Sequence, residues 1–495
     1  MFLASRQSRF LRVALRLRTI PGTSTRAFSA TVPTSKNVLA DLRERGLVAQ
    51  VTSPGVEALV ERPTTVYLGV DPTAESMHVG NLVSLLSLLH FYVRGHSVIA
   101  LVGGATGSIG DPSGRSTERQ VLSEDRMQRN LTGIRTQMHQ LFERGAQLAR
   151  KRGVEDILTD QGNTADRLRV LNNYDWFGSM SALAFLGHVG RHARVGAMLA
   201  RESVKARLTS PQGISFTEFS YQLLQAYDFY HLHREHKCRI QLGGSDQWGN
   251  ITAGIDLIGR MASEKRTAAV ANASEEARPA AFGVTIPLLT TSTGEKFGKS
   301  AGNAVWLDAH MTSYYDFYQF FMRVNDDDVE RYLHIFTFLN SAEIEAIMCE
   351  HKEQPEKRYA QSRLAAETTE LVHGEHGLYR AQIATRVLFG SPQQDLCASD
   401  LLAAFEHDPR LVRLSADKAL GVRLDRLAHA AGACASRSEA TKLLKAGGFY
   451  LNHQRITDGS RLLAANDLID GAVCVLRTGK TNYRIVHVEG GVASP

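Results

Sequence analysis

The chain is poor in cysteine: it has five in 495 residues, and no two of them form a C-x-x-C pair. A disulfide framework needs clustered thiols and a zinc ribbon needs closely spaced ligand pairs, so this spacing argues against both. We expect reduced thiols at all five positions, which are Cys238, Cys349, Cys397, Cys434 and Cys474. His231, His233 and His236 lie near Cys238 in the sequence, but we assign no metal site to this cluster.

Long apolar runs are also missing. No stretch approaches the ~18 apolar residues that a membrane-spanning helix needs, so we expect no membrane partner. Hydrophobic residues make up 43% and charged residues 22% of the chain, which is typical of a soluble globular enzyme. The length predicts roughly three domains.

The first 40 residues contain no Asp or Glu, but they contain six arginines interleaved with apolar side chains. Such a start is typical of a mitochondrial transit peptide, which we predict over residues 1–35, with localisation in the mitochondrial matrix. A disordered basic tail that touches RNA is the alternative. Without these six arginines, the 57 basic residues would fall to the number of acidic ones, 51, so an RNA-binding surface must be a local patch.

Strand and helix patterns alternate after this leader. Residues 65–70 and 98–102 are typical of buried strands, and the leucine-rich stretch 81–94 between them has helical spacing. Residues 239–242 and 282–289 are later strand candidates. The alternation predicts an α/β fold with a Rossmann-type parallel sheet.

The chain divides into three predicted regions after the leader. A Rossmann-type catalytic domain spans residues 36–325 and contains an exposed insertion at 264–281, which has no sustained apolar face. A helical domain follows at 326–408, and a small C-terminal α+β domain at 409–495.

Two glycine-containing loops follow the first two predicted strands. The loop from Asp71 to Asn81 places His78 and Gly80 at a helix start, where free backbone N–H groups and the helix dipole favour an anion. The loop from Gly103 to Gly114 has five glycines in twelve residues and carries the carboxylate of Asp111. It lacks the G-x-G-x-x-G order of dinucleotide-binding proteins, so it predicts a ligand crevice but not NAD binding.

Two later loops carry further polar groups. The loop from Gly243 to Asn250 again joins a strand to a helix. The loop from Gly294 to Ser300 carries Lys296 and Lys299. Two ammonium groups on such a loop can hold and release a polyphosphate; an ordinary basic hairpin tip is the alternative.

A helix is predicted from Ser215 to Asp228, because Ser215 and Glu218 form the pattern of a capping box. Tyr221, Gln225 and Asp228 fall in one stripe of this helix. The stripe is either solvated or a binding surface. The opposite face is apolar and is expected to pack inward; it consists of Phe216, Phe219, Leu223 and Tyr227.

The order of these motifs resembles the class I aminoacyl-tRNA synthetases. Within that class the chain resembles the bacterial-type tyrosyl-tRNA synthetases from about Val38 to Val488, including the segment Asn172 to Trp176. Asn81 stands where the family's first signature has a second His, and Phe297-Gly298 stand where its second signature has Met-Ser. Both variants are expected within the family.

The resemblance implies a role for each of these positions. Tyr67 and Asp228 would bind the phenol hydroxyl of tyrosine, and its amino and carboxylate groups would contact Asp111, Tyr221, Gln225 and Gln247. ATP would be bordered by Gly69, Asp71, Gly244 and Asp246, with its phosphates and ribose meeting Thr73, His78 and Asn81. The leaving pyrophosphate would contact Lys296 and Lys299, and Arg115 and Arg119 occupy positions that resemble the family's mobile cationic loop.

The reaction implied is that of a tyrosine–tRNA ligase. ATP converts tyrosine to tyrosyl-adenylate and pyrophosphate, and the tyrosine is then transferred to the 3′ end of tRNA(Tyr). The tyrosine carboxylate is itself the nucleophile, so the reaction needs donors for the leaving phosphates and no general base. ATP would be a substrate accompanied by Mg²⁺, with no tightly bound prosthetic group.

The C-terminal domain resembles a small RNA-binding fold shared with a ribosomal small-subunit protein. Between Ala419 and Val488 there are ten basic and five acidic residues, and the candidate RNA contacts are Arg437, Lys442, Lys445 and Arg455. Phosphate contacts of this kind predict salt-sensitive tRNA binding, with the helical domain on the anticodon side. A solvated basic face is the alternative.

Two rival functions share the same scaffold. A tryptophan-specific relative is disfavoured by Tyr67 and Asp228, because an indole offers only a donor. A synthetase-derived RNA-binding protein that assists group I intron splicing is left open by the insertion at 264–281. The resemblance also implies a homodimer.

Overall fold

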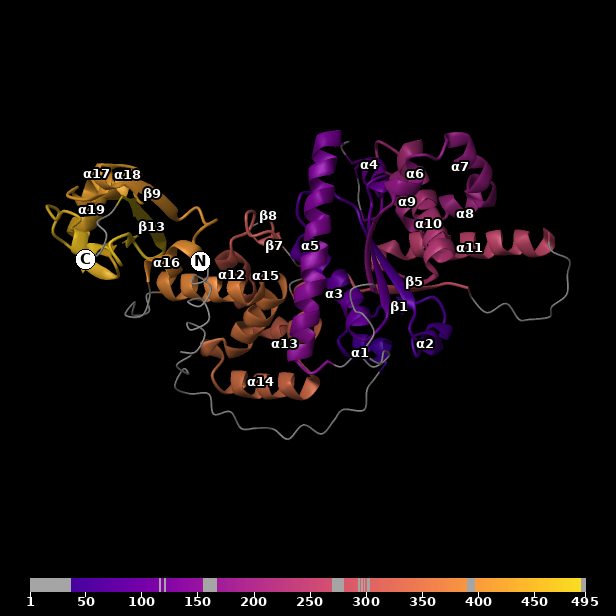
Figure 1. Cartoon of the computed structure of the whole chain (residues 1–495), viewed down its shortest axis with the longest axis horizontal. Helices are drawn as coiled ribbons and strands as arrows, with labels where there is room; N and C mark the ends of the chain where they lie inside the picture. The colour runs from indigo at the N-terminus through magenta and orange to yellow at the C-terminus, as the bar shows by residue number, and fades with distance from the viewer. Residues whose placement is uncertain are drawn as a thin grey trace, which may run out of the picture. The chain divides into compact units, whose positions relative to one another are not determined.

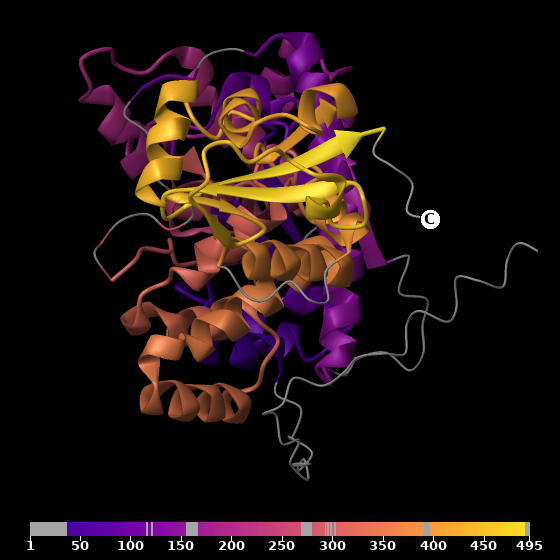
Figure 2. The ribbon, with the colours of Figure 1, turned by 90° about the vertical axis from the view of Figure 1, so that its left-hand side faces the viewer.

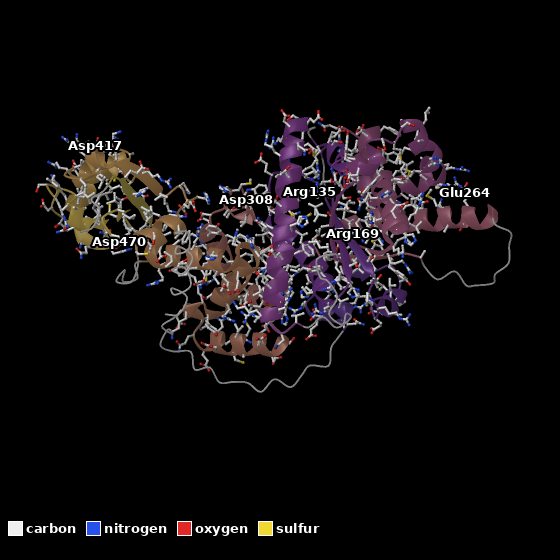
Figure 3. The ribbon with its side chains drawn as sticks, in the orientation of Figure 1. Arg135, Arg169, Glu264, Asp308, Asp417 and Asp470 are labelled. Carbon is white, nitrogen blue, oxygen red and sulfur yellow. The ribbon has the colours of Figure 1, made fainter. Side chains whose placement is uncertain are left out.

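The computed structural model describes residues 37–490, except for 115–116, 120–121, 155–166, 269–279, 293, 295–296, 298, 301–302 and 390–396. The predicted transit peptide therefore lies outside the described residues, as does most of the predicted insertion. The first residues of that insertion extend a long helix, α11 (Trp248–Ala268). Glu264, labelled in Figure 3, lies on this helix and forms an ion pair with Arg191 at 2.9 Å.

The main sheet has six strands in the order β1-β6-β5-β2-β3-β4. Their bounds are β1 Gln50–Val51, β2 Thr65–Val70, β3 Ser97–Val102, β4 Leu168–Asn172, β5 Cys238–Gly244 and β6 Phe282–Ile286. The prediction of a parallel sheet is confirmed by β2 to β6; β1, which the sequence did not predict, pairs antiparallel with β6. The strand order reverses between β2 and β5, and ligands bind at such a point in open α/β sheets.

Helices cover both faces of this sheet (Figure 1). Val66 and Leu68 of β2 pack into one core with α3 and α5, whereas Tyr67 packs into another core with α10 and α11. Alternate residues of a strand point to opposite faces, so a strand buried on both sides is apolar throughout. The helices of this region are α1 Val38–Glu44, α2 Gly55–Leu59, α3 Val79–Val93, α4 Thr106–Ile109, α5 Glu124–Lys151, α6 Tyr174–Phe177, α7 Ala182–His188, α8 Val195–Leu199, α9 Glu202–Leu208 and α10 Phe216–His236.

The helical region follows a short two-stranded sheet formed by β7 (Lys299–Ser300) and β8 (Asn303–Ala304). Its helices are α12 Tyr314–Met322, α13 Asp326–Phe336, α14 Ser341–Glu353, α15 Tyr359–Leu388 and α16 Ala398–Ala404. Buried side chains of α12, α13 and α15 belong to the same core as α3 and β2. Arg45, which follows α1, donates hydrogen bonds to the carbonyl oxygens of His334, Thr337 and Leu339 at 3.1, 2.8 and 3.1 Å.

The middle of α15 contains one residue with non-helical dihedrals, Gly374 (φ 72°, ψ 179°). This backbone region is accessible almost only to glycine. A Cβ at Gly374 would make only ordinary contacts, the nearest with Arg144 Nε at 3.7 Å, so backbone strain and not crowding forbids a side chain there.

We expect Gly374→Ala to lower the free energy of unfolding by about 1–3 kcal/mol, because alanine must adopt this conformation. Gly259→Ala is the matched control, since Gly259 is exposed within α11 and a Cβ there meets nothing within 4 Å. That control is expected to stabilise by about 0.5–1 kcal/mol. Urea unfolding of both variants measures the difference, and equal effects would contradict the assignment.

The C-terminal region folds around a five-stranded sheet with the order β11-β10-β12-β13-β9 and its own core. Helices pack against this sheet (Figure 2). The elements are β9 Leu411–Ser415, α17 Ala416–Ala419, α18 Leu424–Ala430, α19 Arg437–Ala446, β10 Phe449–Leu451, β11 Gln454–Ile456, β12 Val473–Thr478 and β13 Asn482–Glu489. The predicted fold class is confirmed. Among the described residues, no helix is both long and apolar enough to cross a membrane.

Candidate active site

The candidate site lies where β2, β3 and β5 end at the point of strand reversal. Asp71 follows β2, the glycine loop follows β3, and the 3₁₀ turn Ser245–Gln247 follows β5. Two glycines after β3 allow polar side chains to reach the backbone. A Cβ at Gly103 would lie 2.3 Å from Asp71 Oδ1, and a Cβ at Gly104 would lie 2.2 Å from Asn172 Oδ1.

Asp71 joins three parts of the site through its carboxylate. It accepts hydrogen bonds from Thr106 Oγ1 at 2.9 Å, Tyr221 OH at 3.1 Å and Arg119 Nη1 at 3.2 Å. Burial raises the pKa of Asp71, and the positive charge of Arg119 opposes this shift. The contacts tie α4, α10 and the loop before α5 to the end of β2.

Asp228, on α10, is buried opposite the end of β4. Asn173 Nδ2 donates to Asp228 Oδ2 at 3.0 Å, and Trp176 Nε1 donates to Asp228 Oδ1 at 2.9 Å. Burial raises the pKa of Asp228 from 3.8 to about 8, although both hydrogen bonds act in the opposite direction. The carboxylate is therefore an acceptor held in a site that disfavours its charge.

The hydroxyl of Tyr67 is buried and has no hydrogen-bond partner among the described residues. Burial raises the pKa of Tyr67 well above its usual range, and the nearby charge of Asp228 raises it further. A buried polar group without a partner costs free energy unless a ligand satisfies it. Tyr67 and Asp228 thus present a donor and an acceptor to one small polar group.

The pKa of Asp228 predicts a pH dependence of stability. A carboxyl whose folded-state pKa is raised contributes stability below about pH 4, and this contribution is lost as the pH rises through about 8. We expect Asp228→Asn to flatten the fall of unfolding free energy over this range, by at most about 1.4 kcal/mol per pH unit. Denaturant unfolding at several pH values measures the slope, with the exposed Asp175→Asn as control. Equal slopes for wild type and Asp228→Asn would show that titration of Asp228 does not cause the pH dependence of stability.

A second network lies beside Asp71. Gln247 Nε2 donates to Asp111 Oδ2 at 2.7 Å, and Gln225 Nε2 donates to Gln247 Oε1 at 3.2 Å. The amide of Ser113 donates to Asp111 Oδ1 at 2.9 Å. Gln225 Oε1 is buried without a partner among the described residues, so this network also has an acceptor left for a ligand.

The prediction of an inward-packing apolar face on α10 is wrong. Tyr221 and Asp228 of the polar stripe are buried, whereas Phe216 is 75% exposed and Phe219, Leu223 and Tyr227 are only partly covered. The stripe faces the ends of the strands, and the apolar face points away from them. The predicted cap is half confirmed: Ser215 accepts from the Glu218 amide at 3.2 Å, but the Glu218 carboxylate binds Arg207 instead of completing the box.

Comparisons with known proteins agree with this arrangement. The family model described as tRNA synthetases class I (W and Y) matches residues 59–390, and the S4 domain model matches residues 422–469. The chain belongs to the class I tRNA synthetases. It is 44% identical over 458 residues to a tyrosine–tRNA ligase of Rhodopirellula baltica, covering 92% of this chain and 97% of that protein.

Fungal relatives of this synthetase include mitochondrial ones. It is 42% identical over 461 residues to the mitochondrial tyrosine–tRNA ligase of Saccharomyces cerevisiae, covering 92% of this chain and 89% of the relative. A C-terminally truncated mitochondrial tyrosyl-tRNA synthetase of Aspergillus nidulans has a similar structure, with a TM-score of 0.63 and 36% identity. The match covers 72% of this chain and 95% of that one.

The synthetase signature around His78 is a helix start, as its sequence predicts. His78 is the residue before α3; its Nδ1 accepts from the Asn81 amide at 3.2 Å, and Asn81 Oδ1 accepts from the His78 amide at 3.1 Å. These reciprocal bonds hold the imidazole at the positive end of the helix dipole. The amide of Thr73 donates to the Asp71 carbonyl at 2.9 Å in the preceding turn.

Other predicted positions are described only in part. Arg115 and Lys296 lie outside the described residues, and Lys299 is described only as backbone of β7. A Cβ at Gly244 would lie 2.5 Å from Asp246 Oδ1, whereas Gly69 has open space beside it.

Sequence reasoning assigned no role to Asn173, Trp176 or Thr106, although the first two lie in a segment that resembled the family. The position of Asn173 and Trp176 shortly after the end of β4 was the available signal for these two residues. The histidines near Cys238 have other partners: His231 stacks on Trp176 with ring centroids 4.3 Å apart, and His233 Nδ1 lies 2.9 Å from the Cys238 carbonyl oxygen. Within the part of the chain that the structure describes, no cluster of three or more metal-binding side chains occurs.

Proposed function

We propose that this protein is a tyrosine–tRNA ligase that activates tyrosine with ATP and transfers it to the 3′ end of tRNA(Tyr). The observation that carries the proposal is the buried Tyr67 hydroxyl, which has no partner among the described residues and lies within electrostatic reach of the buried Asp228 carboxyl. Together they offer a donor and an acceptor, which suit a phenol hydroxyl. An indole has only a donor, so this pair favours tyrosine over tryptophan.

The remainder of the tyrosine site is proposed around Asp71 and Asp111. The ammonium group of tyrosine binds near Asp111, Tyr221 and Gln225, where Gln225 Oε1 has no partner among the described residues. Gln247 lies next to the substrate carboxylate. This orientation directs the carboxylate away from Asp228 and towards the ends of β2 and β5.

ATP is proposed to bind as its Mg²⁺ complex, as a substrate. Gly69, Asp71, Gly244 and Asp246 border the adenosine, and Thr73, His78 and Asn81 contact phosphates and ribose at the start of α3, where the helix dipole favours anions. Lys296, Lys299, Arg115 and Arg119 contact the leaving pyrophosphate. Arg119 bonds Asp71 in this structure, so it must exchange that partner for phosphate oxygens.

The test is ATP–pyrophosphate exchange by protein lacking residues 1–28, with tyrosine, phenylalanine or tryptophan as substrate. Exchange with tyrosine alone supports both the ligase activity and the hydroxyl-binding pocket. Absence of exchange with all three would refute the proposal.

The C-terminal region is proposed to bind tRNA through α19. Arg437, Lys442 and Lys445 are exposed on this helix. Arg455 has a structural contact as well, since its Nε donates to the Gly447 carbonyl at 2.6 Å and so satisfies the end of α19. Phosphate contacts of this kind make tRNA affinity fall as salt rises.

A homodimer is proposed through the apolar surface of α7 to α10. Large apolar side chains are exposed there: Leu183 by 83%, Leu186 by 52%, Val195 by 62%, Leu199 by 41%, Leu208 by 48% and Phe216 by 75%. Exposed large apolar side chains are typical of an interaction site, and a second copy supplies the same apolar chemistry on the facing side.

We expect Phe216→Glu to convert the dimer to a monomer, because a carboxylate buried in an apolar interface loses its hydration. Light scattering measures the mass. Phe389→Glu is the matched control, since Phe389 is 69% exposed at the end of α15, away from α7 to α10. A wild-type protein that is already monomeric would refute the dimer.

Localisation in the mitochondrial matrix is proposed from the Arg-rich leader and from the mitochondrial relatives. The insertion on which the intron-splicing alternative depends lies largely outside the described residues. No observation in the described part favours that role.

A further inference from the structure

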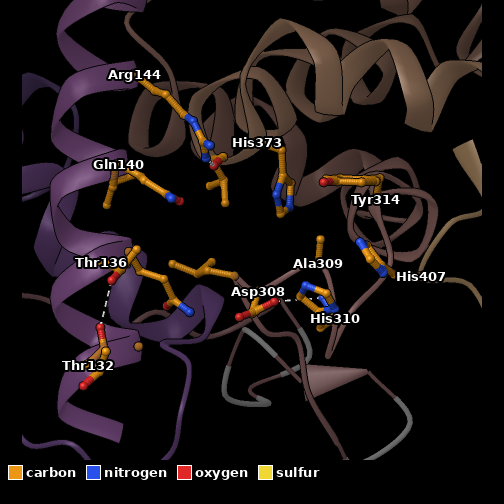
Figure 4. A pocket seen from close by; sticks show the side chains of 15 residues that line it. Thr132, Thr136, Gln140, Arg144, Asp308, Ala309, His310, Tyr314, His373 and His407 are labelled. Atoms are coloured by element: carbon orange, nitrogen blue, oxygen red, sulfur yellow. Dashed lines mark hydrogen bonds between the residues drawn. The ribbon is translucent and has the colours of Figure 1, made fainter. Parts of the chain in front are cut away.

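A cavity of about 440 Å³ lies apart from the candidate active site, between α5, residues 307–314 and the middle of α15 (Figure 4). Leu141, Leu307 and Val372 form buried walls, whereas Gln140 and His407 are exposed at its edge. Its volume falls in the range of small-molecule sites. None of the roles proposed above uses this cavity.

Four rings contribute to the cavity wall: those of His310, Tyr314, His373 and His407. His310 and His407 have ring centroids 4.0 Å apart, and Tyr314 meets His373 edge-on at 5.0 Å. Burial, assisted by the charge of Arg144, lowers the pKa of His373 to about 3, so this ring is neutral at physiological pH. Flat rings of this kind suit a planar aromatic ligand.

Two hydrogen-bonding atoms of the wall have no partner among the described residues: Gln137 Nε2 and His373 Nε2. The amide of Gln137 is fixed in orientation, because its Oε1 accepts from the Met77 amide at 3.0 Å. Together a donor and a ring nitrogen can pair with the polar edge of a heterocycle.

Both charged side chains of the cavity wall, Arg144 and Asp308, already have protein partners, so neither requires a charged group inside the cavity. Arg144 donates to the Val372 carbonyl, and the Asp308 carboxylate accepts from the His310 amide at 2.8 Å. The wall is also bonded to the active-site segment: the Leu307 amide donates to the Met77 carbonyl at 2.8 Å, next to His78.

We propose that this cavity binds a nucleobase, supplied either by an unstacked residue of a bound RNA or by a free nucleotide. The RNA form rests on the proposed function. The planar walls stack the base, and Gln137 and His373 bond its edge. The hydrogen bond between the Leu307 amide and the Met77 carbonyl joins the cavity wall to the residue before His78. A base bound in the cavity is therefore linked to the active site through this backbone bond.

The experiment first saturates the active site with 5′-O-[N-(L-tyrosyl)sulfamoyl]adenosine, so that further binding reports on the cavity. The probes are AMP, GMP, CMP and UMP in one arm and a tRNA(Tyr) transcript in the other. Gln140→Trp fills the cavity mouth, and Gln147→Trp is its control, exposed on the same helix but outside the cavity. His407→Ala is a second variant that removes an exposed stacking ring.

We expect Gln140→Trp and His407→Ala to weaken at least one probe about tenfold, while Gln147→Trp leaves affinity unchanged. A loss confined to the nucleotides identifies a free ligand, and a loss confined to the transcript identifies an RNA base. Unchanged affinity for every probe, or no binding beyond the saturated active site, overturns the proposal. ATP–pyrophosphate exchange measured on the same variants is expected to stay at wild-type level, which separates this failure from failure of the proposed function.

Discussion

Replacing Asp228 with alanine is expected to lower kcat/KM for tyrosine-dependent pyrophosphate exchange about a thousandfold. The variant removes a buried acceptor from the proposed phenol site and leaves the Asn173 and Trp176 donors unpaired. Losing the hydrogen bond to the phenol hydroxyl and leaving two buried donors unsatisfied together amount to about 4 kcal/mol. Exchange assays normalised to active-site titration measure the effect.

The Tyr67 hydroxyl provides a graded comparison. Tyr67→Phe removes one neutral hydrogen bond and is expected to cost about tenfold, with a weaker preference for tyrosine over phenylalanine. Asp175→Ala, an exposed carboxylate of α6, serves as control and should keep wild-type activity. An Asp228→Ala enzyme that still selects tyrosine at normal rates would place the hydroxyl elsewhere.

Arg207→Met is expected to reduce the free energy of unfolding by about 3–5 kcal/mol, because it leaves a buried carboxylate without its partner. Arg207 and Glu218 are 1% and 3% exposed, and the guanidinium binds the carboxylate through two nitrogens at 2.8 and 2.9 Å. Glu218 lies in the first turn of α10, ahead of Tyr221 and Asp228. The KM for tyrosine should therefore rise as well.

The double variant Arg207→Met/Glu218→Met distinguishes the cost of leaving the Glu218 carboxylate unpaired from the cost of losing the whole ion pair. Replacing a whole buried ion pair with apolar side chains is often neutral, so much of the lost stability should return. Arg234→Met is the control for charge alone, since Arg234 pairs with Glu235 at an exposed position. If the double variant is as unstable as the single one, the carboxylate is not the cause.

Long periodic elements were predictable from the sequence, and elements defined by distant partners were not. The strand at 65–70 and the leucine-rich helix were predictable because the apolar residues that each of them buries lie within one short stretch of the sequence. β1 is two residues long and pairs with a strand more than 200 residues away, so no local pattern marks it. The apolar face of α10 was misplaced because periodicity indicates which face is apolar, but not whether a pocket or a partner covers it.

In the candidate site as well, some residues could be predicted from the sequence, but their contacts with distant residues could not. Family resemblance assigned Asp71, Tyr221 and Arg119 to three different parts of the site, yet one carboxylate holds the other two side chains in this structure. Asn173 and Trp176 were missed because an amide and an indole carry no signal of catalysis by themselves. Only folding brings the end of β4 against α10.

The core shared by the catalytic sheet and the helical region has a mechanical consequence. Phe317, Phe321 and Phe336 are packed in the same apolar mass as Leu68 and Leu82, with the three bonds of Arg45 across its edge. Close-packed interiors are stiff and have low compressibility. A displacement of the helical region is therefore expected to move the catalytic sheet with it as one rigid body, because the two regions share one close-packed core.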